Sequence, residues 1–189
     1  EPMIDISEPI EQEMEKFLCR LLKVTFDSKG DDQGVYQFLT ENIDKLNPNF
    51  AEVLQTWSSS KIASLDKTQK PHFAKRILQI SSLIRKFDGG SCETNLEIAL
   101  TGYNIVASVF TRTEYFQQWA ITQNCLGLTY LDRVHGNPEE NLKQAMNYFT
   151  AALSFYNKEQ FPKQRKVILN NLKKATNKNQ WLNKMCQPG

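Results

Sequence analysis

Apolar residues recur every three or four positions along almost the whole chain of 189 residues. This spacing places them on one face of a helix, whereas a half-buried strand would place them at every second position. We therefore expect an all-α protein of about nine helices. The pattern predicts four helices before residue 87 and further helices near 93–111, 115–135, 138–158, 161–175 and 177–186.

The clearest break in the pattern is the segment FDGGS at 87–91, where two successive glycines permit positive φ and end a helix. The segments before and after this break differ, because only the later part shows a convincing internal match. We therefore predict an N-terminal helical segment over 1–90 that packs on the repeats. Residues 91–189 are predicted to hold two repeats and a C-terminal capping helix.

The later part of the chain matches itself at an offset of 46 residues without a gap. The segment that starts at Glu93 is identical to the segment that starts at Glu139 at eight of 34 positions. Because most of the matched positions are apolar or small, the match indicates two copies of one helical unit. The pairs include Asn95/Asn141, Leu96/Leu142, Ala99/Ala145, Asn124/Asn170 and Leu126/Leu172, and aromatic residues are kept at Tyr103/Phe149, Phe110/Tyr156 and Tyr115/Phe161.

Gly127 lies inside the predicted helix over 115–135. A glycine at such a position costs about 1 kcal/mol relative to alanine, so a structural need for a missing side chain is expected. Leu126, Gly127 and Tyr130 form an L-G-x-x-Y pattern that resembles the core of a tetratricopeptide repeat. In that family the small residue lies where the two helices of a hairpin approach closely.

Ala145, Phe149 and Ala152 resemble the second helix of such a repeat. The resemblance covers about residues 36–172. This part of the chain is similar to the extended repeats common in cyanobacterial tetratricopeptide proteins, which often adjoin caspase-like CHAT peptidase domains. It implies a solenoid of helical hairpins. The second copy departs from the pattern at Lys173 and Thr176, so we expect that its next hairpin is not completed.

The resemblance also implies a concave groove lined by the first helix of each hairpin. In the register of the motif, the groove positions that we select as a candidate partner site are Asn124, Leu128, Asp132, Asn170, Asn171 and Lys174, and the same faces also hold Ile121, Leu131, Val167, Asn177 and Lys178. An asparagine amide both donates and accepts hydrogen bonds and so can bind an extended peptide backbone. The alternative is that Asn124 and Asn170 bond to neighbouring helix backbones within the protein.

Charge is distributed unevenly, although the net charge is only +2. From residue 157 to the end the chain has seven lysines and one arginine against one acid, Glu159, and the preceding residues carry the opposite balance. A basic segment of this kind is typical either of a solvated capping helix or of a nucleic-acid-binding surface.

Catalytic and metal-binding patterns are not found. The two histidines, His72 and His135, are far apart in sequence, and no H-x-x-x-H, H-E-x-x-H or C-x-x-C motif occurs. Cys125 and His135 are separated by roughly 15 Å along a helix axis, too far for a nucleophile and its base. We therefore expect no enzyme activity, no catalytic residue, no cofactor and no metal.

The four cysteines are spread along the chain as Cys19, Cys92, Cys125 and Cys186. Cys19 and Cys125 lie among apolar positions, which favours buried thiols in a reducing cytosol and predicts a cytoplasmic protein. No apolar run approaches the roughly 20 residues of a membrane span.

These observations favour a non-enzymatic protein–protein interaction module or adaptor that binds a protein or peptide in its groove. One alternative is a helical-repeat protein that binds nucleic acid through the basic segment 158–184. Another, implied by the resemblance, is the non-catalytic regulatory part of a caspase-like effector.

Overall fold

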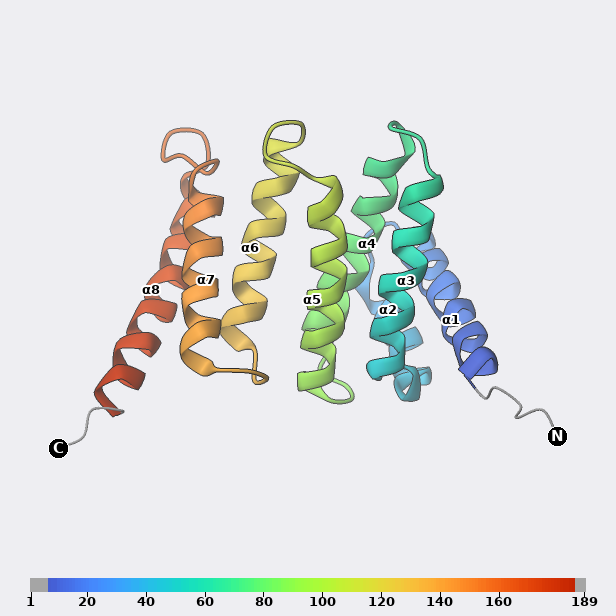
Figure 1. The fold of residues 1–189 in the computed structure, drawn as a ribbon. Coiled ribbons are helices and arrows are strands. Elements are labelled where there is room, and N and C mark those ends of the chain that lie inside the picture. Colours follow the sequence, from blue (N-terminus) through green and yellow to red (C-terminus); the bar gives the residue numbers. More distant parts are fainter. Residues whose placement is uncertain (1–6, 186–189) are drawn as a thin grey trace. The chain divides into compact units, whose positions relative to one another are not determined.

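The computed structural model describes residues 7–185, and about 80% of the chain is helical. No strand occurs among the described residues, so the all-α prediction is confirmed. The helices are α1 (Ser7–Asp27), α2 (Asp32–Glu41), α3 (Pro48–Ser64), α4 (Gln69–Lys86), α5 (Cys92–Val109), α6 (Phe116–Asp132), α7 (Pro138–Leu153) and α8 (Pro162–Met185), with a 3-10 turn over Ile43–Lys45 (Figure 1).

The helices form two compact units, Glu1–Val109 with α1 to α5 and Phe110–Gly189 with α6 to α8. The predicted division between an N-terminal segment (1–90) and the repeats (91–189) is based on sequence patterns, and it stays a prediction. In the first unit α3 packs on α1 and α5, and α4 packs on α1, α2 and α5. The fully buried side chains at the centre of this unit include Leu18, Leu21, Phe50, Leu54, Ile77, Ile80, Ile84, Ile98 and Tyr103.

Helices α4 and α5 approach each other closely at Gly102. A Cβ atom added there would collide with Oγ of Ser81 on α4. The next residue, Tyr103, is fully buried and its hydroxyl donates a hydrogen bond to Oγ of Ser82 at 3.1 Å. Two small residues, Ser81 and Gly102, therefore set the spacing of this pair of helices.

Helices α6 and α7 of the second unit approach each other at Gly127. A Cβ atom added at Gly127 would lie 2.7 Å from Cδ1 and Cε1 of Phe149, whose ring is fully buried. The expectation that Gly127 marks the close approach of two helices is therefore confirmed. The buried core of this unit consists of Ala120, Leu131, Leu142, Ala145, Phe149, Ala152, Tyr156, Ile168 and Ala175.

The two hairpin loops, at positions 46 residues apart, share their local structure. Asn95 on α5 donates from Nδ2 to the carbonyl oxygen of Gly89 at 2.9 Å, and Asn141 on α7 donates in the same way to His135 at 2.7 Å. Both asparagines are buried. Ala74 on α4 is as fully buried as Ala120, 46 residues later on α6, and glycines with positive φ stand at Gly90 (+73°) and Gly136 (+83°).

Helix α8 runs unbroken from Pro162 to Met185, so the prediction of two helices over 161–175 and 177–186 was wrong. Thr176, at the expected break, donates from Oγ1 to the carbonyl oxygen of Leu172 at 2.9 Å and remains in the helix. Neither proline nor glycine lies between residues 163 and 185, and weak helix formers alone do not end a helix that packs on a neighbour.

The cysteines differ in part from expectation. Cys19 is exposed, because Phe17, Leu18 and Leu21 form the buried face of α1 and leave Cys19 on the outer face. Cys125 is half-buried, and Cys92 is exposed. Within the described part of the chain these three thiols form no disulfide, and Cys186 lies outside the described residues.

Candidate partner-binding groove

Three helices build the candidate site in the second unit. Helix α7 packs against both α6 and α8, and α6 and α8 also contact each other. Asn137 fixes the start of α7, since its Oδ1 accepts hydrogen bonds from the backbone N–H groups of Glu139 and Glu140 at 2.9 and 3.1 Å. Pro138 follows in the first turn, where its missing N–H costs nothing.

A hollow of about 490 Å³ lies between the C-terminal turn of α6 and the middle of α8. We call it the α6/α8 groove. The side chains of Asp132 and Lys174 are exposed there, so the groove presents both signs of charge. Its lining residues are Leu131, Asp132, Lys174, Asn177 and Lys178.

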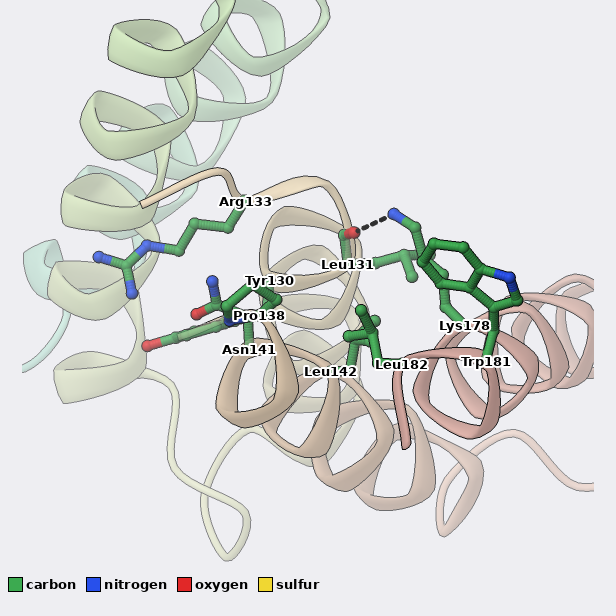
Figure 2. Close-up of a pocket in the computed structure, with 9 residues that line it drawn as sticks. All are labelled: Tyr130, Leu131, Arg133, Pro138, Asn141, Leu142, Lys178, Trp181 and Leu182. Carbon is green, nitrogen blue, oxygen red and sulfur yellow. Dashed lines mark hydrogen bonds between the residues drawn. The ribbon is translucent and has the colours of Figure 1, made fainter. Parts of the chain in front are cut away.

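Lys178 ties the two helices of the groove together. Its Nζ donates to the carbonyl oxygen of Leu131 at 3.3 Å, the dashed line in Figure 2. The carbonyl groups in the last turn of a helix lack intrahelical partners and carry the negative end of the helix dipole, so a lysine there is favoured. The bond holds Lys178 at the end of α6.

A smaller pocket of about 140 Å³ adjoins the groove and shares Leu131 and Lys178 with it. Figure 2 shows Lys178 and Trp181 side by side on α8, with Leu142 and Leu182 below them. Trp181 has 59% of its surface exposed, which is unusual for so large an apolar side chain. The pocket is lined by Tyr130, Leu131, Arg133, Pro138, Asn141, Leu142, Lys178, Trp181 and Leu182.

Aromatic contacts fix one wall of this pocket. The rings of Tyr130 and Tyr148 stack with centroids 5.5 Å apart, and the guanidinium carbon of Arg133 lies 5.5 Å from the centroid of Tyr130. Burial raises the pKa of Tyr148, with a smaller contribution from Tyr130 beside it. Arg133 is the charged group of this wall.

The predicted residues on α6 have different surroundings. Asp132 is exposed and lines the groove. Leu128 is half-buried and packs against the core of the unit. Asn124 is half-buried, and its Oδ1 is buried without a hydrogen-bond partner among the described residues.

The predicted residues on α8 also divide. Lys174 is exposed and lines the groove opposite Asp132. Asn170 is exposed but does not line the groove, and Asn171 is buried with 9% of its surface exposed. Asn170 and Asn171 differ because successive residues of a helix are turned by about 100°, so that one is exposed and the next is buried.

Trp181 was missed as a site residue, together with the rest of the smaller pocket. Trp181 and Leu182 lie in the predicted helix over 177–186, which we expected to cap the repeats. Only Leu182 packs against the core, whereas Trp181 stays on the surface. The sequence did contain a signal for this site residue. Trp181 follows the predicted groove residue Lys174 by two helical turns, in a helix without acids.

No three metal-ligating side chains come together within residues 7–185. None of the described helices is both long and apolar enough for a membrane span. Comparisons of the chain with protein-family models, curated proteins and solved structures find no match.

Proposed function

We propose that the chain is a non-enzymatic protein-interaction module of the tetratricopeptide type, and that a protein or peptide partner binds along the α6/α8 groove. One observation carries the proposal. All five residues that line the groove stand at positions that the register of the repeat motif assigns to a binding face. The register was set by the L-G-x-x-Y pattern around Gly127, which is independent of the groove.

The close approach of Gly127 and Phe149 supports this register, since it is the contact that the family pattern requires. The repeated hydrogen bonds of Asn95 and Asn141 support it further, because they give the two hairpin loops the same geometry. Lysine and aspartate on facing helices can bind complementary charges of a peptide, while Leu131 offers an apolar floor.

A random-peptide display library screened against the whole chain tests the proposal. Peptides should be enriched, and Lys174→Glu with Lys178→Glu should weaken their binding at least about tenfold, or about 1.4 kcal/mol. Lys163→Glu with Lys166→Glu is the matched control, because it makes the same charge change on α8 at residues that do not line the groove. Thermal unfolding of both variants shows whether the loss of the bond from Lys178 affects the fold.

The asparagine pair gives a second arm of the same experiment. If the amides bind the partner, Asn124→Ala with Asn170→Ala weakens binding roughly 5- to 150-fold, since each lost amide contact contributes about 0.5–1.5 kcal/mol. Unchanged binding removes both residues from the site. Failure to enrich any peptide contradicts the proposed function itself.

Nucleic-acid binding is the second candidate, and the charge of α8 favours it. From Pro162 to Met185 the helix carries six lysines and one arginine and no acid. A phosphate backbone binds to cations without regard to groove geometry. In that case both charge reversals weaken binding of a single-stranded oligonucleotide alike, and salt weakens it further.

A further inference from the structure

A second hollow, of about 320 Å³, lies in the first unit among α1, α3 and α4. Trp57 and Lys61 reach it from one face of α3, where they stand four residues apart, and Leu65 reaches it from the residue that follows this helix. Phe73 and Arg76 reach it from α4, at a spacing of three. We call this hollow the basic-aromatic groove.

The aromatic side chains of Trp57 and Phe73 line the groove together with Leu22 and Leu65. The rings of Trp57 and Phe73 contact each other with centroids 5.9 Å apart, and both side chains are half-buried. Phe26, at the end of α1, has 60% of its surface exposed and lies under Arg76, whose guanidinium carbon is 4.3 Å from the ring centroid. Arg76 also lines the groove, so the exposed ring of Phe26 beside it adds apolar surface next to the groove.

The charged groups that line the groove are all basic. Lys61 and Arg76 are exposed there, and no carboxylate of the described residues lines the groove. Asp66, the acid in the α3–α4 loop, forms hydrogen bonds within that loop. Its Oδ1 accepts hydrogen bonds from the backbone N–H groups of Thr68 and Gln69 at 2.8 and 2.9 Å.

We propose that the basic-aromatic groove is a second interaction site, which binds an acidic amphipathic helix of a partner protein. The charge of the edge selects carboxylates, and the aromatic floor selects large apolar side chains. Residues 57 to 64 span about 10 Å at the C-terminal end of α3, which matches the two helical turns between anchors at i, i+4 and i+7. The hollow is wide and shallow, which suits a helix better than a small molecule enclosed on most sides.

The experiment uses the whole chain with Trp119→Phe and Trp181→Phe, so that Trp57 is its remaining tryptophan. The probe is a synthetic helical peptide with leucines on one face and glutamates on the flanks of that face. We expect saturable binding with a change in Trp57 fluorescence. A peptide with glutamine in place of every glutamate should bind at least about tenfold more weakly.

Two variants test the groove directly. Lys61→Glu with Arg76→Glu should weaken binding of the acidic peptide at least about tenfold. Phe26→Ala should weaken it as well, and because Phe26 is exposed this substitution removes no side chain from the buried core. The matched control is Lys16→Glu with Arg20→Glu, which makes the same charge change on α1, where Arg20 lies 5.3 Å from the ring centroid of Phe38. It should change binding less than about twofold.

Three results would overturn the inference. The glutamine peptide could bind as tightly as the acidic one, or the control variant could weaken binding as much as the groove variant. Lys174→Glu with Lys178→Glu could abolish binding, which would place the peptide in the α6/α8 groove. That last result would contradict binding in the basic-aromatic groove but not the proposed function of the α6/α8 groove, so the experiment distinguishes failure of one proposal from failure of the other.

Discussion

Gly127 shows how one missing side chain positions two helices. The ring of Phe149 occupies the space into which a Cβ atom would project. A glycine within a helix costs about 1 kcal/mol relative to alanine, but any larger residue would displace a fully buried ring from the core of the second unit. Packing therefore favours glycine at position 127, although glycine has a low helix propensity.

Gly127→Leu should lower the free energy of unfolding by about 1–3 kcal/mol, because the new side chain overpacks against Phe149. Gly34→Leu is the matched control, since Gly34 also lies in a helix but has no atom within 4 Å of an added Cβ. Urea unfolding measures both variants. Equal stability of the two would show that the contact with Phe149 does not constrain position 127.

At the scale of elements, the two hairpin loops are built alike. A glycine with positive φ turns the chain before α5 at Gly90 and before α7 at Gly136. A buried asparagine in the first turn of the following helix, Asn95 or Asn141, then holds the loop carbonyl groups. The identical pair Asn95/Asn141 in the sequence match is thus explained by loop geometry.

Asn95→Ala and Asn141→Ala should each destabilise the protein by about 1–3 kcal/mol, because each leaves loop carbonyl groups without their hydrogen-bond donor. The controls are Asn104→Ala and Asn147→Ala, which alter exposed asparagines on the same two helices. Chemical denaturation measures all four. A loss no greater than that of the controls would mean that water replaces the amide at little cost.

At the scale of the whole molecule, the chain has two compact units, and each has its own buried core. The proposed binding sites also divide, with the α6/α8 groove in the second unit and the basic-aromatic groove in the first. A unit with its own core can lose stability locally without unfolding the rest of the chain.

Hydrogen exchange should therefore respond unit by unit. Gly127→Leu should raise the exchange rates of α6, α7 and α8 by roughly 5- to 150-fold, the equivalent of its expected destabilisation, and leave α1 to α4 unchanged. Gly102→Leu should do the reverse, because its side chain would collide with Ser81. A uniform rise along the whole chain after either substitution would show that the protein unfolds as one cooperative unit.

The sequence by itself determined the helical class and the close approach at Gly127, and it contains the 46-residue self-match from which we predict a repeat. These features depend on local periodicity and on residue types with a single structural meaning, such as a glycine within an apolar helix. It also assigned Asp132 and Lys174 to facing positions, because the repeat fixes which helices correspond.

Tertiary packing decided the features that depend on contacts between segments distant in sequence. Helix α8 continues through Thr176 although that residue favours a break, since packing on α7 outweighs local propensity. The thiol of Cys19 is exposed because the apolar face of α1 is narrower than the run of apolar residues suggested. The basic-aromatic groove depends on Leu22, Trp57 and Phe73 from three helices meeting at one surface, and no local pattern records such a meeting.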